Sequence, residues 1–236
     1  MEVGAERQNM AERASIEELG RAGLRRVRRA TYALGRIRAK SDFNGSAEYW
    51  DRRYRLGSDS GAGSYGQTAV RKAAFLNAFV AEHHVQSVIE FGCGDGNQLS
   101  LAEYPSYVGL DVSPEAVRAC QARFAGDATS QFKVVADYDG EQADLALSLD
   151  VIYHLVEDCV FEDYMRLLFG AAERYVIIFS SNTNRRIPVD RAHVRHRRFT
   201  DWTARQDSWK LQHGSSSFQI RRCASFFVFE RVSSAK

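Results

Sequence analysis

Residues 88–96 read Val-Ile-Glu-Phe-Gly-Cys-Gly-Asp-Gly, an apolar run that leads directly into three glycines. The apolar part has the composition of a buried strand. Gly92, Gly94 and Gly96 let the chain turn tightly and let a ligand approach the backbone without meeting a Cβ atom. A glycine loop at the carboxyl end of a strand lies at the ligand crevice of an open α/β sheet. The nonapeptide therefore predicts a crevice for a nucleoside-containing ligand.

The spacing of these glycines narrows the class of ligand. Dinucleotide enzymes usually carry G-x-G-x-x-G and bind a pyrophosphate at the N-terminus of the helix that follows. Here the pattern is G-x-G-x-G, and Asn97 stands where the third glycine of the dinucleotide pattern is expected. Glu90 precedes the first glycine by two residues. A carboxylate at that position suits a cationic ligand better than it suits a pyrophosphate.

Strand-like and helix-like segments alternate on both sides of this loop. We expect strands at residues 86–91, 106–111, 132–136, 144–149 and 174–180. We expect helices at residues 46–56, 67–84 and 160–172, and from residues 97 and 113 onward. This alternation implies a mostly parallel sheet with right-handed crossovers. Two last strands, residues 208–213 and 224–232, have no long helix between them and predict a terminal antiparallel hairpin.

Acidic residues follow two later strands at the same edge of the predicted sheet. Asp111 ends the second strand, where a carboxylate can accept hydrogen bonds from ribose hydroxyls. This indicates an adenosine-type ligand without separating NAD from S-adenosylmethionine. Asp137 follows the third strand and can accept from an adenine amino group, while the neighbouring Tyr138 ring can stack on the base.

These elements together resemble the class I S-adenosylmethionine-dependent methyltransferases. The matching residues are Glu90 to Gly96, Asp111, Asp137 and Ser148 to Leu155, within a region of about residues 86–182. The resemblance implies an α/β fold with a seven-stranded, mostly parallel Rossmann-like sheet, helices on both faces, a terminal antiparallel hairpin, and N-terminal helices before it. The cofactor is then S-adenosylmethionine. The cofactor contacts implied are Glu90, Gly92, Gly94, Asp111, Val112, Asp137, Tyr138 and the backbone of Leu149.

A narrower resemblance concerns the methyl acceptor. The loop Gly61 to Gly66, the run Val151 to Leu155 and residues 193–202 look like small bacterial methyltransferases found with glycan-building enzymes. They are similar in kind to the sugar O-methyltransferases of mycobacterial methylmannose polysaccharide synthesis. We therefore expect methylation of a hydroxyl of a saccharide or glycan precursor.

Other functions stay open at this stage. One is N- or C-methylation of another small metabolite, a second is non-catalytic binding of S-adenosylmethionine, and a third is association with RNA through the arginine-rich segments. The Asn/Asp-Pro-Pro-aromatic signature of many nucleic-acid and protein N-methyltransferases is missing after the fourth strand, where the chain has Ser148 to Val151. This disfavours the methylation of DNA or protein amines.

His154 is the candidate catalytic base, because it follows the fourth strand and imidazole is the usual proton acceptor near neutral pH. Asp150 lies four residues earlier and would orient the ring if the segment is helical. The candidate substrate-binding residues are Tyr153, His193, Arg195 and His196. Asp150, Glu157 and Asp158 are also candidate ligands of Mg²⁺.

Two segments before the core have open roles. Residues 57–66 contain four glycines and three serines, which is typical of a linker or of a mobile lid, and Ser64 would then contact the cofactor. Residues 16–40 form an expected basic amphipathic helix. That helix would pack on its own domain or a second subunit as a homodimer, or make peripheral contact with anionic lipid or an acidic partner. We expect a boundary between a tail of residues 1–45 and a domain of residues 46–236.

Composition limits the broad class. The chain has 236 residues and a formal net charge of +2, which does not suit a dedicated nucleic-acid binder, so we expect no nucleic-acid partner. No apolar run approaches the ~20 residues of a membrane span, and no secretion signal stands out, so we expect a cytoplasmic enzyme. The four cysteines are too far apart for zinc spacing or a disulfide framework, which predicts reduced, mostly buried thiols.

Overall fold

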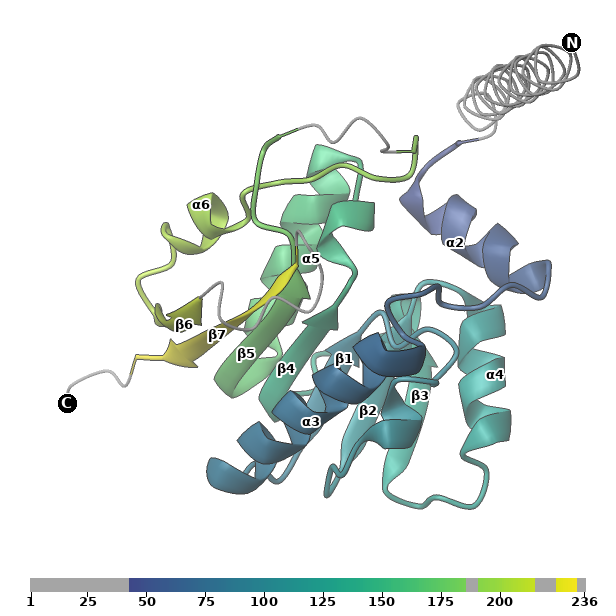
Figure 1. The fold of residues 1–236 in the computed structure, drawn as a ribbon, viewed down its shortest axis with the longest axis horizontal. Helices are drawn as coiled ribbons and strands as arrows, with labels where there is room; N and C mark the ends of the chain where they lie inside the picture. Colours follow the sequence, from purple (N-terminus) through teal and green to yellow (C-terminus); the bar gives the residue numbers. More distant parts are fainter. Residues whose placement is uncertain (1–42, 186–190, 215–223, 233–236) are drawn as a thin grey trace, which may run out of the picture. The chain divides into compact units, whose positions relative to one another are not determined.

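The computed structural model describes residues 43–185, 191–214 and 224–232. Its centre is one seven-stranded sheet with the strand order β3-β2-β1-β4-β5-β7-β6 (Figure 1). The strands are β1 (Val88–Phe91), β2 (Tyr107–Asp111), β3 (Ser130–Val134), β4 (Ala143–Leu149), β5 (Ala172–Ser180), β6 (Trp209–Gly214) and β7 (Ser225–Arg231). Strands β1 to β5 pair in parallel, whereas β7 runs antiparallel to both of its neighbours. The predicted fold class and terminal hairpin are therefore confirmed.

Helices cover both faces of the sheet, as expected. The α-helices are α2 (Ser46–Arg55), α3 (Gly66–Glu82), α4 (Pro114–Arg123), α5 (Asp158–Gly170) and α6 (Thr200–Thr203). Short 3-10 helices occur at η1 (Leu99–Leu101), η2 (Val135–Asp137) and η3 (Ile152–His154). Leu76 of α3 and Cys120 of α4 pack into the core on one face, and Met165 of α5 and Trp202 of α6 pack into the core on the other. Figure 1 shows α3 lying across the sheet.

The alternation of side chains along a strand decides which face each residue serves. In β1, Val88 packs with the α3 and α4 side, whereas Ile89 and Phe91 pack with the α5 side. In β4, Leu147 packs with α3 and α4, and Ala146 packs with α5. All four residues of β1 are buried, which explains why this central parallel strand reads as an almost continuous apolar run.

The structure differs from the sequence-based expectation after the glycine loop. The helix expected from residue 97 is only the 3-10 turn η1. The backbone N–H of Asn97 donates to Oδ1 of Asp95 at 3.0 Å, as at a helix start, but the backbone is already extended at Ala102, with φ of −90° and ψ of 151°. The third strand is also shifted, since β3 ends at Val134 and η2 follows it.

Several expectations concern residues that the structure does not describe. The basic segment 16–40 and Cys223 lie outside the described residues. Of the other cysteines, Cys93 and Cys120 are buried free thiols, and Cys159 is exposed. Among the described helices, none is long and apolar enough to cross a membrane.

Gly92→Ala should destabilise the protein more than Gly140→Ala, although both glycines have positive φ angles, of +90° and +98°. A Cβ at position 140 meets open space, so this variant should lose only about 1–2 kcal/mol from backbone strain. A Cβ at position 92 would lie 2.5 Å from Cγ2 of Val151, which adds roughly 1–3 kcal/mol of overpacking. Urea unfolding of both variants measures the difference, and equal losses would contradict it.

Candidate functional site

A cavity of about 510 Å³ opens at the carboxyl ends of β1, β2 and β4. Three loops of the sheet contribute to its wall, with Gly92 and Gly94 after β1, Asp111 and Val112 at the end of β2, and Leu149 at the end of β4. Residues of α2 and of the loop that follows it, Ser64 among them, also line the wall, as do residues of η3 and α5. The structure therefore gathers six of the nine predicted cofactor residues around one space of the size typical of small-ligand sites.

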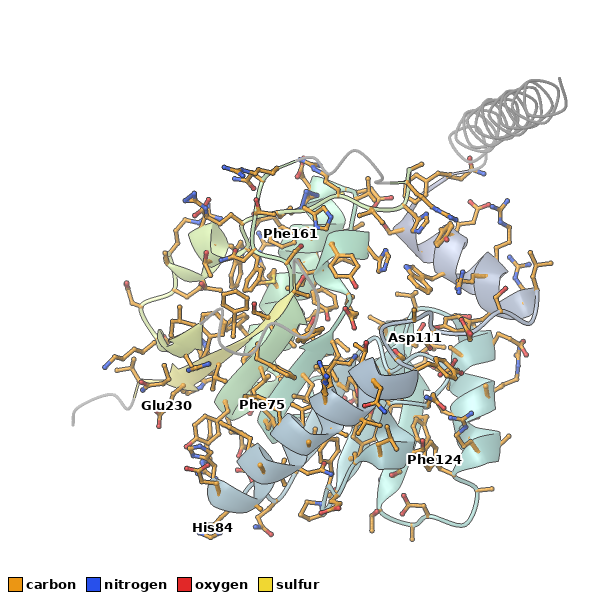
Figure 2. All side chains as sticks on the ribbon, viewed as in Figure 1. Phe75, His84, Asp111, Phe124, Phe161 and Glu230 are labelled. Carbon is orange, nitrogen blue, oxygen red and sulfur yellow. The ribbon has the colours of Figure 1, made fainter. Side chains whose placement is uncertain are left out.

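Asp111 connects two of these loops. Its Oδ2 accepts a hydrogen bond from the backbone N–H of Gly94 at 3.0 Å, and its Oδ1 accepts from the N–H of Ser113 at 2.9 Å. The carboxylate is 5% exposed, and burial raises the pKa of Asp111 to about 6 although these bonds act in the opposite direction. Figure 2 labels this side chain at the end of the sheet that faces α2. A buried carboxylate on a ligand cavity is a suitable acceptor for a pair of ligand hydroxyls.

The other three predicted cofactor residues lie outside the cavity wall. Glu90 is buried under the glycine loop, where its Oε2 accepts from the Tyr107 hydroxyl at 2.7 Å. Asp137 is exposed in η2. The Tyr138 ring packs edge-on against Phe91, with centroids 5.5 Å apart. Roles of these residues toward a cofactor stay predictions.

Residues 46–65, here called the lid segment, cover the cavity from the side of α2. The lid segment is fastened to the glycine loop by reciprocal bonds, since Ser60 N–H donates to Oδ2 of Asp95 and Asp95 N–H donates to Oγ of Ser60, both at 2.9 Å. The Tyr65 hydroxyl also donates to Asp95 at 2.7 Å. Burial alone would raise the pKa of Asp95, but these hydrogen bonds outweigh it and lower the pKa. Residues 60–64 of the glycine-rich loop thus border the cavity, and movement of this loop as a lid stays a prediction.

The other end of the lid segment is fastened to the loop after β4. Ser46 donates its backbone N–H to Glu157 at 2.8 Å and its hydroxyl to the same carboxylate at 2.5 Å. The N–H of Val156 donates to the Ser46 hydroxyl at 2.9 Å. Between the two ends, the Ser113 hydroxyl donates to Asp51 of α2 at 2.9 Å. No sequence motif marks these serine hydrogen bonds, and the sequence analysis did not predict them.

His154 lies on the cavity wall, enclosed by aromatic rings. Trp50 meets it edge-on at 4.8 Å, and the His193 ring lies nearly parallel to it at 5.5 Å. The Nδ1 atom of His154 lies 3.0 Å from the backbone carbonyl of His193. A carbonyl only accepts, so this bond requires the proton on Nδ1 and leaves a lone pair on Nε2. Burial lowers the pKa of His154 to about 4, and the ring is therefore neutral at physiological pH.

Two of the four predicted substrate-binding residues reach the cavity. Tyr153 and His193 line it, and the Tyr49 ring stacks on His193 with centroids 4.0 Å apart. Arg195 instead pairs with Asp158 at 3.0 Å, and His196 is hydrogen-bonded to the Ser181 hydroxyl. Neither of these two lies on the cavity wall. In loop 191–198, His193 therefore lines the cavity, whereas Arg195 and His196 bind neighbouring segments.

The expected hydrogen bond between Asp150 and His154 does not form. Asp150 has φ of +63°, and His154 ends a 3-10 helix, so the two residues are not one α-helical turn apart on the same face. The carboxylate of Asp150 instead pairs with Lys72 at 2.9 Å and accepts from the Tyr153 hydroxyl at 2.6 Å. The residue that orients the His154 ring is His193, through its backbone carbonyl.

The possible magnesium site gains no support. Asp150, Glu157 and Asp158 have different partners, namely Lys72, Ser46 and the pair Arg195 and Arg197. In the part of the chain that the structure describes, no group of three or more metal-ligating side chains is found. The carboxylates near this cavity act as anchors for neighbouring segments.

The sequence analysis did not identify Trp50 and Arg53 of the cavity wall, nor Lys72, which pairs with Asp150. Trp50 and Arg53 lie on the cavity wall, with the guanidinium 5.6 Å above the indole ring. Lys72 is fully buried in α3. A signal for Lys72 exists in the sequence, because it falls three residues after Ala69 and four before Leu76, on the buried face of that helix.

The sequence matches a known protein family. A family described as a methyltransferase domain matches residues 63–225. No curated protein matches the chain in sequence.

Solved structures share the fold at low sequence identity. Magnesium protoporphyrin IX methyltransferase from Synechocystis PCC 6803, with bound S-adenosylhomocysteine, is 17% identical with a TM-score of 0.55, covering 82% of this chain and 98% of that one. The N-methyltransferase NodS from Bradyrhizobium japonicum WM9, also with S-adenosylhomocysteine, is 15% identical with a TM-score of 0.57, covering 80% and 100%. The methyltransferase domain of bacterial CtHen1-C is 20% identical with a TM-score of 0.55, covering 70% and 98%.

Glu90→Gln should change how stability depends on pH. Burial raises the pKa of Glu90 from 4.5 to about 7. Between these values the unfolded chain ionises this group while the folded protein keeps it protonated. Its contribution to stability is thus complete below pH 4.5 and is lost as the pH rises through 7. Glutamine at position 90 still offers an oxygen to the Tyr107 hydroxyl. It does not titrate, so its contribution to stability does not fall as the pH rises.

Relative to wild type, Glu90→Gln should therefore gain roughly 2 kcal/mol in the free energy of unfolding between pH 5 and pH 8. Urea unfolding of both proteins at the two pH values measures this gain. Asp111 titrates in the same range but is present in both proteins, so its contribution cancels. Parallel pH profiles of the two proteins would contradict the assignment.

Proposed function

Because this chain belongs to the class I S-adenosylmethionine-dependent methyltransferases, we propose that it methylates a hydroxyl group of a saccharide or glycan precursor, with His154 as the general base. The observation that carries the proposal is the His154 ring on the cavity wall, whose Nδ1 bond to the His193 carbonyl leaves the lone pair of the neutral ring on Nε2. A hydroxyl is a poor nucleophile while it keeps its proton, and a positioned base typically contributes ~10²–10⁴ in rate.

The cavity fits the cofactor of this enzyme class. The backbone of Gly92 and Gly94 borders it without side chains, and Asp111 offers a buried carboxylate for the two ribose hydroxyls. The end of β4 at Leu149 offers backbone for the amino group of the methionine part, and Ser64 borders the same space from the lid segment. When bound, S-adenosylmethionine supplies an electrophilic methyl group on a sulfonium sulfur.

In this proposal the residues after β4 prepare the acceptor. His154 accepts the hydroxyl proton at Nε2, while its Nδ1–H stays bonded to the backbone carbonyl of His193. The lid segment excludes water, and the rings of Tyr49, Trp50 and Tyr153 hold the acceptor near the methyl group. Holding the reacting groups in line supplies much of the barrier reduction in such a displacement.

The aromatic wall supports a saccharide acceptor. Tyr49, Trp50, Tyr153 and His193 all line the cavity, so that both apolar ring surface and polar ring atoms border it. A sugar ring has apolar C–H faces that pack on such rings and hydroxyls that need polar partners at the edges. The volume of about 510 Å³ suits a cofactor together with a small acceptor group better than a folded macromolecule.

The acceptor is tested with a panel of compounds and radiolabelled S-adenosylmethionine. We expect label in hydroxylated sugars and glycan precursors, and none in matched deoxy sugars that lack the reactive hydroxyl. Small amines and thiols serve as the competing acceptor classes. Label that enters only amines or thiols would refute the O-methylation proposal while leaving the enzyme class intact.

His154→Ala should lower kcat by a factor of ~10²–10⁴. Binding of S-adenosylhomocysteine, measured by calorimetry, should change by no more than about threefold if His154 serves the acceptor and not the cofactor. Because the pKa of His154 is about 4, the rate should not show the loss below pH 6.5 that is typical of an ordinary imidazole base. His83→Ala, at the end of α3 outside the cavity, is the matched control and should keep wild-type kcat. An unchanged kcat in His154→Ala would contradict its role as base.

A further inference from the structure

Lys72 of α3 lies next to Asp150, at the end of β4, and does not reach the cavity. Its side chain is 0% exposed, and Nζ makes an ion pair of 2.9 Å with Oδ2 of Asp150. Nζ also lies 5.4 Å from the centre of the Phe179 ring. Lysine is almost never fully buried without a partner, because its charge loses the solvation of water. The position of this ammonium group is therefore tied to that of the Asp150 carboxylate.

Asp150 has the least ordinary backbone conformation at the end of β4. Its φ of +63° is in the left-handed region, which a residue with a side chain adopts at a cost. The N–H of Asp150 donates to the Phe179 carbonyl at 2.8 Å, and Oδ1 accepts from Tyr153 at 2.6 Å. The ion pair with Lys72 is the third contact that holds Asp150 in this conformation. Together these contacts hold the turn that leads from β4 into η3.

The lid segment rests on the same carboxylate. A Cβ placed on Gly63 would lie 2.5 Å from Oδ2 of Asp150, so the lid backbone approaches the carboxylate as closely as a glycine allows. Three segments therefore meet at Asp150, namely α3 through Lys72, the lid segment through Gly63, and η3 through Tyr153. The next residue after Tyr153 is the candidate base His154.

We propose that Lys72 is a positioning residue for methyl transfer, which acts through Asp150 to fix η3 and thereby to aim Nε2 of His154 at the acceptor. This proposal rests on the function proposed above for His154. Lys72 touches neither cofactor nor acceptor, since it is fully buried and does not line the cavity. Its effect reaches the reaction through the Tyr153–Asp150 hydrogen bond and the contact with Gly63.

A purely stabilising role explains the pair less well. Replacing a buried ion pair by apolar residues of similar volume is often neutral or even stabilising, so such a pair is not needed for stability alone. What an apolar pair would not supply is an acceptor for the Tyr153 hydroxyl at a fixed point. The ion pair with Lys72 holds the Asp150 carboxylate in place at the edge of the cavity.

The test compares Lys72→Met with the double variant Lys72→Met/Asp150→Asn. Methionine keeps most of the side-chain volume and removes the ion pair. Asparagine tolerates the left-handed conformation and keeps a carbonyl acceptor for Tyr153. Lys133→Met is the matched control. It removes an ion pair between Lys133 of β3 and Glu141, which is partly exposed, and this variant should behave as wild type.

The first readout needs no acceptor, so it is independent of the saccharide proposal. NMR of ¹⁵N-histidine-labelled protein reports the tautomer of His154, whose signals are identified by their loss in His154→Gln. We expect the Nδ1–H form in wild type and in Lys133→Met. In Lys72→Met we expect shifted or broadened His154 signals, because the segment that holds the ring is released.

The second readout is kinetic, with whichever acceptor the panel identifies. We expect kcat of Lys72→Met to fall by roughly 10–100-fold, as for a small displacement of a catalytic group, while the Kd for S-adenosylhomocysteine changes by less than about threefold. The double variant should recover part of this loss. If only the melting temperature falls in Lys72→Met, while His154 signals and kcat per folded enzyme stay at wild-type values, the proposal is wrong.

Tyr153→Phe provides the check if Lys72→Met does not fold. It removes only the hydroxyl that joins η3 to Asp150. The proposal requires that the His154 signals move in this variant as well and that kcat falls by about tenfold or more. His154 signals identical to wild type in Tyr153→Phe would overturn the positioning role of the Lys72–Asp150 pair.

Discussion

The site depends on a single carboxylate that joins two neighbouring strand ends. Asp111 at the end of β2 binds the N–H of Gly94 from the loop after β1, and the N–H of Ser113 that begins the path into α4. This arrangement requires parallel strands in register, because only then do the two carboxyl ends meet at one edge. It also requires glycine after β1, since the side chain of Val151 occupies the space that a Cβ at residue 92 would need. The crevice follows from these two requirements.

Sequence reasoning predicted this part of the molecule because its signals are local. Glycine spacing, β-prone runs and the helix expected from residue 113 each depend on a few neighbouring residues. In the structure Ser113 caps α4, and its hydroxyl accepts from the Ala116 N–H. The same reasoning failed for the helix expected at residue 97, where the backbone becomes extended at Ala102 after a single 3-10 turn.

Contacts between distant segments could not be predicted in the same way. Asp150 stands four residues before His154, a spacing that indicates contact only on an α-helix, and the chain forms a 3-10 turn there. The true partner of Asp150, Lys72, is 78 residues away. Glu157 was a candidate metal ligand from its charge alone, yet it binds Ser46 from a segment 111 residues earlier. Pairings of this kind depend on tertiary structure, and a pattern in one stretch of sequence does not contain them.

The way in which α2 is attached has a consequence for the dynamics of the protein. Only Ser46 and Tyr54 of this helix are buried, so it contributes little apolar surface to the core. The hydroxyls of Ser46, Ser60 and Ser113 hold it instead, and water can replace each of these bonds at a net cost of about 1 kcal/mol. Segments with few buried apolar contacts open at a fraction of the global unfolding free energy. We therefore expect residues 46–65 to open locally at a lower free energy than the seven strands of the sheet.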